Sequence, residues 1–228
     1  MSSEPWKALL SARRSAHGSS ITHRFDLIAE RLLNGCTLHA AASVYHIAEI
    51  EFYFHSSHHP DPFVHRHAEQ KICGGWYLHR QGVGFRSGTF KGIDLCFGHR
   101  LAYGGILIRS LVPIPSLRRF DRPADADAPL ICGPSLVVDA LMRDLQIATV
   151  GELHQVISRQ PAWSGANPLH VRWRPLKRRP IWQTRRIGLK WSPEPDRRYF
   201  LELPYRYLNA PRRIRKGRSL PLKRVHGT

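Results

Sequence analysis

The segment from Ile47 to Phe54 carries two carboxylates and a tyrosine along one side of an alternating pattern. Its even-numbered residues are all apolar, so at a period of two that side can enter a core. The other side presents Glu49, Glu51 and Tyr53. A carboxylate pair beside an aromatic ring, on a strand packed from behind, is a candidate site for chemistry that uses a carboxylate. An acidic strand that faces solvent fits the same pattern equally well.

Arg109 is unusual because it interrupts an apolar run, 104–112, that is typical of a strand covered on both faces. A buried guanidinium without a partner costs several kcal/mol. Glu49 and Glu51 are therefore its expected partners if the two strands are neighbours. The alternative is an edge strand from which Arg109 points into water.

A histidine-rich loop follows the acidic strand. Six potential metal ligands lie within thirteen positions: His55, His58, His59, Asp61, His65 and His67. Imidazole and carboxylate groups suit zinc, but their spacing matches no closed zinc motif. Histidines in such a loop also suit contacts to phosphates and bases. A zinc-dependent hydrolase is kept as the weaker interpretation.

The composition favours a polyanionic partner. The 228 residues include 35 Lys or Arg against 17 Asp or Glu, a net charge of +18. From Arg172 onward there are 18 Lys or Arg and three acids, with aromatic residues interleaved. This pattern favours nucleic acid as the first candidate partner and an anionic membrane surface as the second. The alternative is a basic tail without a specific partner. Nucleophile elbows and Gly-rich phosphate loops are absent from the sequence, which argues against serine hydrolases and nucleoside triphosphate chemistry.

The four cysteines form no CxxC pair, no signal peptide is visible, and no apolar run has the length of a membrane span. We therefore expect an intracellular protein of a reducing compartment, in bacterial cytoplasm or in a nucleus, without membrane association.

Periodicity and turn residues predict the order of the elements that position these side chains. We expect a helix over 22–34, a long polar loop over 55–75, hairpin strands at 93–98 and 104–111, a helix with Ser135 as its N-cap, a short helix over 150–157, and basic strands within 169–207. Residues 1–20 are expected to be a mobile segment, 21–207 a single domain, and 208–228 a basic, disordered tail.

Taken in order, six motifs resemble the alkyladenine (3-methyladenine) DNA glycosylase family over about residues 22–205. They are Glu49-Ile50-Glu51-Phe52-Tyr53, Asp61 with His65, Gly88-Thr89-Phe90 leading into the hairpin, Arg109, Gly133-Pro134-Ser135, and Arg186-Ile187-Gly188. The resemblance implies an α+β fold: a single domain with a curved, mainly antiparallel sheet, a protruding hairpin and flanking helices.

The resemblance also implies an activity: a monomeric enzyme that hydrolyses the N-glycosidic bond of a modified base flipped out of double-stranded DNA, without a metal or other cofactor. Glu51 would activate the attacking water, and Arg109 would keep Glu51 ionised. Tyr53 would stack on the base and His65 would hydrogen-bond to it. Phe97 would fill the gap left in the base stack.

The chain departs from the family where a second aromatic side chain stacks on the base. Asp94 stands there and cannot stack, but its carboxylate can accept hydrogen bonds from an amino group or a protonated base. An altered base preference is the consequence we expect. A second hypothesis is a binding module that keeps this fold, has lost base excision, and uses its charge to hold nucleic acid.

Overall fold

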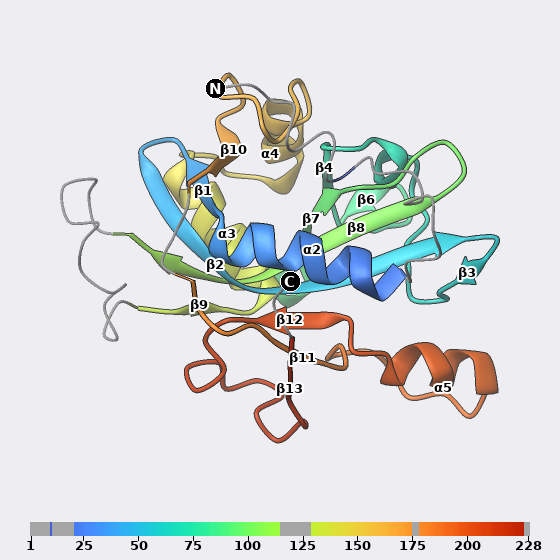
Figure 1. Cartoon of the computed structure of the whole chain (residues 1–228). Helices are drawn as coiled ribbons and strands as arrows, with labels where there is room; N and C mark the ends of the chain where they lie inside the picture. The colour runs from blue at the N-terminus through green and yellow to red at the C-terminus, as the bar shows by residue number, and fades with distance from the viewer. Residues whose placement is uncertain (1–9, 11–20, 115–128, 175–177, 226–228) are drawn as a thin grey trace.

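The computed structural model describes residues 10, 21–114, 129–174 and 178–225. They form an α+β domain around one large, open, mainly antiparallel sheet, as predicted. Figure 1 shows the two long strands, β2 (Ser43–Ser56) and β8 (Tyr103–Pro113), crossing the molecule side by side. The path of the sheet runs β13-β11-β12-β2-β8-β7-β4, and β1 joins β10 to β2.

The remaining elements are short. The other strands are β1 (Cys36–Ala40), β3 (His59–Pro60), β4 (Trp76–Leu78), β5 (Arg80–Gln81), β6 (Gly84–Phe85), β7 (Ile93–Cys96), β9 (Ile131–Cys132), β10 (Leu169–Trp173), β11 (Trp182–Thr184), β12 (Arg206–Leu208) and β13 (Lys223–Arg224). The helices are α2 (Ile21–Asn34), α3 (Pro134–Asp144), α4 (Val150–Ile157) and α5 (Pro195–Glu202), with 3-10 turns η1 (Ala68–Lys71) and η2 (Gly88–Phe90).

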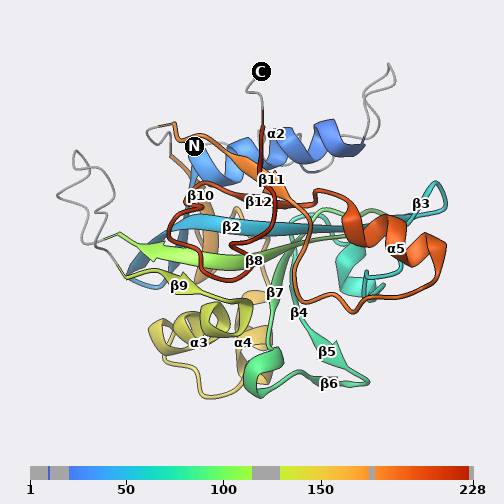
Figure 2. The same ribbon diagram turned by 90° about the horizontal axis from the view of Figure 1, so that it is seen from below.

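Helices lie on both sides of β2 and β8. Figure 2 shows α2 on one side and α3 with α4 on the other. The apolar stripe of α2 packs on the even-numbered side of β2, where the rings of Phe25 and Phe52 stack with centroids 4.3 Å apart. Glu49, Glu51 and Tyr53, on the odd-numbered side, are buried as well. The interpretation of this side as a solvent-facing acidic surface is therefore wrong.

Two predictions near the helices need correction. Ser135 is not the N-cap of α3: Gly133 holds that position and Pro134 begins the helix, since proline's missing N–H costs nothing there. The Ser135 hydroxyl donates instead to the carbonyl of Gly88 at 2.7 Å. The helix α5 was missed because it lies within the basic segment that we assigned to strands.

The predicted hairpin of β7 and β8 is present. Strand β7 pairs with β8 on one side and with β4 on the other, which places the hairpin inside the main sheet. The reversal lies at His99–Ala102, where the two residues form an isolated bridge.

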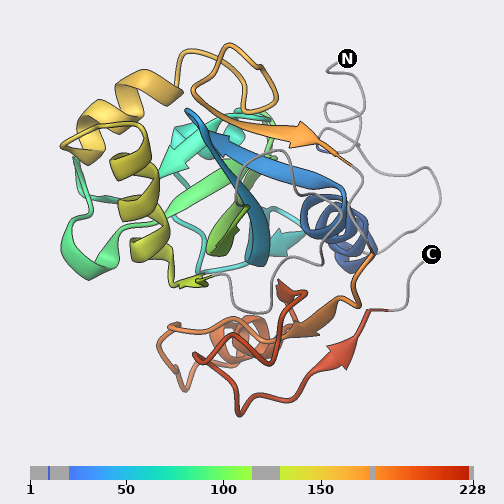
Figure 3. The ribbon, with the colours of Figure 1, turned by 90° about the vertical axis from the view of Figure 1, so that its left-hand side faces the viewer.

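The C-terminal segment is not a disordered tail over 208–225. Figure 3 shows it, in red, lying along one side of the molecule. Strand β13 pairs with β11, Leu208 belongs to β12, and Ile214 is buried. Backbone pairing and a few separated apolar anchors, among them Ala210 and Ile214, fix this segment, and they form no periodic pattern in the sequence. Residues 226–228 lie outside the described residues.

The mobile segment predicted for 1–20 also lies outside the described residues, except for Leu10. That side chain is buried, and its carbonyl accepts a hydrogen bond from Arg24. Among the helices that the structure describes, none combines the length and apolar character needed to cross a membrane.

Candidate functional site

A buried cluster of two carboxylates and two guanidinium groups joins three adjacent strands. Glu49 Oε1 accepts hydrogen bonds from Arg109 Nε at 3.1 Å and from Arg206 Nε at 2.7 Å. Arg109 Nη1 donates to Glu51 Oε2 at 3.2 Å. All four side chains are buried. The expected pairing of Arg109 with both glutamates is confirmed, and Arg206 is an additional partner that the sequence did not reveal.

An irregularity in the β2–β8 pairing shapes this cluster. The register shifts between Ile47 and Ile50, so that Glu49 lies opposite Ser110. Bulges re-aim side chains in this way. Here the shift lets Glu49 accept a hydrogen bond from the Ser110 hydroxyl as well as from Arg109 on the same strand.

Glu51 is fully buried, and its carboxylate is held from three directions. Besides Arg109, the backbone N–H of Ile187 donates to Oε1 and the Tyr53 hydroxyl donates to Oε2, both at 2.9 Å. Burial lowers the pKa of Arg109, but the charges of Glu51 and Glu49 outweigh this effect and raise it. The guanidinium therefore stays charged next to the carboxylates.

Tyr53 connects this cluster to a cavity. Burial first, and then the charge of Glu51, raise the pKa of Tyr53 well above its ordinary value, so the phenol remains a proton donor. The guanidinium of Arg186 lies 4.7 Å from the centroid of the Tyr53 ring. Tyr53 also packs with Leu107 and with the partly buried Phe63 in a small apolar cluster.

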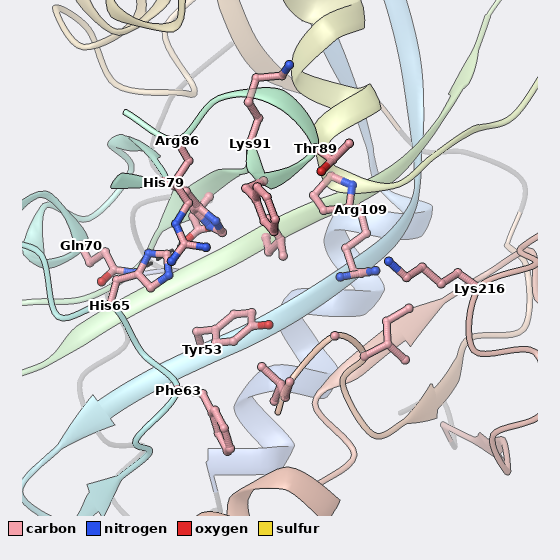
Figure 4. Close-up of a pocket in the computed structure, with 17 residues that line it drawn as sticks. Tyr53, Phe63, His65, Gln70, His79, Arg86, Thr89, Lys91, Arg109 and Lys216 are labelled. Atoms are coloured by element: carbon pink, nitrogen blue, oxygen red, sulfur yellow. Dashed lines mark hydrogen bonds and ion pairs between the residues drawn. The ribbon is translucent and has the colours of Figure 1, made fainter. Parts of the chain in front are cut away.

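The cavity has a volume of about 210 Å³ and is open to solvent. Figure 4 shows Tyr53 between two groups of side chains, with His65 and His79 on one side and Arg109 and Lys216 on the other. Four predicted site residues line it: Tyr53, His65, Asp94 and Arg109. Glu51 lies directly behind this wall, one hydrogen bond away through either Tyr53 or Arg109.

Asp94 anchors the wall that faces Arg109. It is only 1% exposed, and its carboxylate meets His79 Nε2 at 2.9 Å and Gln70 Nε2 at 3.3 Å. A Cβ at Gly105 would lie 2.4 Å from Asp94 Oδ2, so the neighbouring strand needs glycine at this position. Both oxygens of Asp94 keep a lone pair for a further donor.

His65 lies beside this carboxylate and is neutral. Its Nδ1 is 3.0 Å from the Tyr77 hydroxyl, and its ring centroid is 4.5 Å from that of His79. Part of the His65 side chain is exposed to solvent. The neighbouring rings desolvate the rest of it, and this desolvation, followed by the charge of His79, lowers the pKa of His65. It therefore offers an uncharged imidazole to the cavity at neutral pH.

The Asp61 carboxylate pairs with an arginine and not with other potential metal ligands. Arg186 Nη1 donates to Asp61 Oδ2 at 2.7 Å, and both side chains are fully buried. Among the other loop residues, His67 caps η1 and His55 contacts the Asp61 carbonyl. Within the described ranges, no group of three or more His, Cys, Asp or Glu side chains is arranged to hold a metal ion.

The structure contradicts the wedge role predicted for Phe97. Its side chain is 1% exposed and packs in the core against Phe25, Phe52 and Phe54. An intercalating side chain must project into solvent, so Phe97 cannot enter a base stack without disrupting the core. The resemblance places Phe97 at the wedge position just before the hairpin glycine, but the chain reverses further on, between His99 and Ala102.

Sequence reasoning missed several side chains that build the site. They are Gln70, His79, Phe90, Arg186, Arg206 and Lys216. Only Phe90 and Arg186 stood inside motifs that we had singled out. Of these residues, Phe90 is notable because it lines the cavity and is 70% exposed, a large apolar ring held at the opening.

The comparisons with known proteins give a family for the chain. No family model matches it. The uncharacterized protein L759 of Acanthamoeba polyphaga mimivirus is 31% identical over 212 residues, which cover 86% of this chain and 90% of the viral protein. The chain belongs to the family of this mimivirus protein. Since the match takes in most of both chains, it applies to the domain as a whole, while the chemistry of the site has to be argued from its residues.

Proposed function

We propose that this protein is a monofunctional DNA glycosylase, which hydrolyses the N-glycosidic bond of a modified base flipped into the cavity. The observation that carries the proposal is the position of Glu51. Its carboxylate is held by Arg109, the Ile187 N–H and Tyr53 directly behind a cavity that an aromatic ring and a carboxylate line. The six motifs in family order support the same activity.

In this mechanism a water molecule enters between Arg109 and the sugar of the flipped nucleotide. Its oxygen forms a bond to the anomeric carbon, while the bond from that carbon to the base nitrogen breaks and the base leaves with the electron pair. The Tyr53 hydroxyl relays the water proton to Glu51 Oε2, and the proton finally passes to the departing base. The charge of Glu51 stabilises the positive sugar in the transition state.

The cavity walls supply recognition in this proposal. The ring of Tyr53, which lines the cavity, stacks on the base, and the Arg186 guanidinium lies against this ring and holds it in place. Asp94 accepts hydrogen bonds from an amino group or a protonated ring nitrogen, and neutral His65 adds one polar contact. Phe90 provides the second aromatic contact that Asp94 cannot.

A panel of duplexes, each with a single alkylated or deaminated purine, tests the proposal. We expect abasic sites, detected by strand cleavage in alkali, on at least one member of the panel and none on the unmodified duplex. The absence of abasic sites on every duplex, with the folded protein in excess, would contradict the proposal.

One observation favours a second candidate, a nucleic-acid-binding module without excision. Glu51 is 0% exposed, and each of its oxygens already accepts a hydrogen bond, as in a purely structural ion cluster. For this candidate, the charge of +18 gives salt-dependent binding to nucleic acid, and no substrate is converted.

A further inference from the structure

A short basic turn near the C-terminal end, residues 215–218, reaches the cavity through one of its side chains. Lys216 lines the cavity. The backbone carbonyl of Lys216 accepts a hydrogen bond from Arg206 Nη2 at 2.9 Å, while Arg206 Nε bonds to Glu49 at 2.7 Å. A single buried side chain therefore links the turn to the carboxylate cluster behind the cavity.

Gly217 makes this close approach possible. Its φ of +71° lies in the left-handed region, and a Cβ there would lie 2.6 Å from Arg206 Nη1. A larger residue would be strained at this φ, and it would force the turn or the buried end of Arg206 to shift. The turn is thus fixed against the sheet and is not a freely moving end of the chain.

The side chains of the turn carry a concentrated positive charge. Arg215, Lys216 and Arg218 are exposed, and no acidic residue follows Glu202 in the sequence. None of the ion pairs formed within the described ranges involves these three side chains. Exposed cations without acidic partners, held on a fixed backbone next to a cavity, suit an anionic ligand.

We propose that this turn binds the phosphodiester backbone of the DNA strand whose nucleotide enters the cavity. The assignment rests on the proposed function and deepens it, because it gives the segment 208–225 a role. Phosphate contacts position a protein on DNA without reading its sequence. Lys216 contacts the phosphate next to the flipped nucleotide, and Arg218 the following one.

Binding to an undamaged duplex over a series of salt concentrations tests this assignment. The variant Lys216→Gln/Arg218→Gln should bind more weakly at low salt, and its slope of log affinity against log salt should fall by about one to two, since each phosphate contact contributes about 0.9. The matched control, Arg159→Gln/Arg172→Gln, removes the same charge from exposed side chains outside the cavity lining and should keep the wild-type slope.

A second variant, Gly217→Ala, changes no charge but strains the left-handed turn and crowds Arg206 Nη1, and it should also lower the slope. The assignment would be overturned if Lys216→Gln/Arg218→Gln and Arg159→Gln/Arg172→Gln lowered the slope equally. An unchanged slope in Lys216→Gln/Arg218→Gln would also overturn it. These results are independent of excision: a protein that binds DNA through this turn but releases no base contradicts only the proposed activity.

Discussion

The hydroxyl of Tyr53 donates a hydrogen bond to Oε2 of Glu51 at 2.9 Å, which connects the surface of the cavity to a fully buried carboxylate. The two residues are two positions apart on β2, so they share one face of the strand. This spacing lets one element supply both the ring that lines the cavity and the carboxylate behind it.

Tyr53→Phe tests whether this hydroxyl takes part in the reaction. The ring remains, but Glu51 loses a donor and the proton relay. We expect the rate of base release to fall by about 10- to 100-fold, as for the loss of one hydrogen bond to a charged group, with an unchanged affinity for the substrate duplex. Single-turnover kinetics with separate binding measurements check this. An undiminished rate would show that the hydroxyl has only a structural role.

Arg109→Gln should destabilise the fold strongly, because it leaves Glu49 and Glu51 buried without their shared partner. We expect the free energy of unfolding in urea to fall by about 3–5 kcal/mol. The exposed Arg159→Gln should stay within about 0.5 kcal/mol of wild type. A loss of stability in Arg109→Gln no larger than in this control would contradict the buried pairing.

Phe90→Ala removes the exposed ring at the cavity opening. If this ring holds the flipped base, the fluorescence change of a 2-aminopurine placed beside the target nucleotide should diminish, and the Michaelis constant should rise. Phe90→Trp should restore both. Val83→Ala is the matched control, since Val83 is fully exposed but lies outside the cavity lining. Identical behaviour of the two alanine variants would remove Phe90 from the binding site.

The stability of the protein should fall in mild acid. Burial, followed by nearby cationic groups, lowers the pKa of both His39 and His46 from 6.5 to about 4. Between these values the unfolded chain takes up protons that the folded chain does not, so stability is lost as the pH falls from 6.5 towards 4. Each residue contributes at most about 1.4 kcal/mol per pH unit there, and partial exposure reduces this.

Urea denaturation at pH 7 and pH 5 measures this dependence. The double variant His39→Gln/His46→Gln should show a smaller difference in unfolding free energy between the two pH values than the wild type. An equally large difference would mean that other groups cause the acid sensitivity.

The sequence predicts the parts of this fold that have a period or a terminal signal. The apolar stripe of α2 and the alternation in β2 both predict the correct element, and an isolated Arg in the apolar run of β8 predicts its carboxylate partners. The C-terminal segment was not predictable because backbone pairing at β13 and a few scattered apolar anchors, such as Ala210 and Ile214, leave no periodic pattern.

The site was predictable where residues lie close in sequence, and where an isolated charge in an apolar run requires a buried partner, as Arg109 does with Glu49 and Glu51. The contact of Arg206 with Glu49 spans 157 positions, and that of Arg186 with Asp61 spans 125, so neither leaves a local signal. The error at Phe97 has another cause. An aromatic residue near a hairpin turn has the same pattern whether it faces solvent or packs in the core.

The central claim is that Glu51 activates water, and single-turnover base release by Glu51→Gln tests it most directly. On a duplex that the wild type converts, we expect the rate to fall by about 10²- to 10⁴-fold while the duplex is still bound. Glu202→Gln, which removes an exposed carboxylate from α5, should keep the wild-type rate. An unchanged rate in Glu51→Gln would contradict the claim.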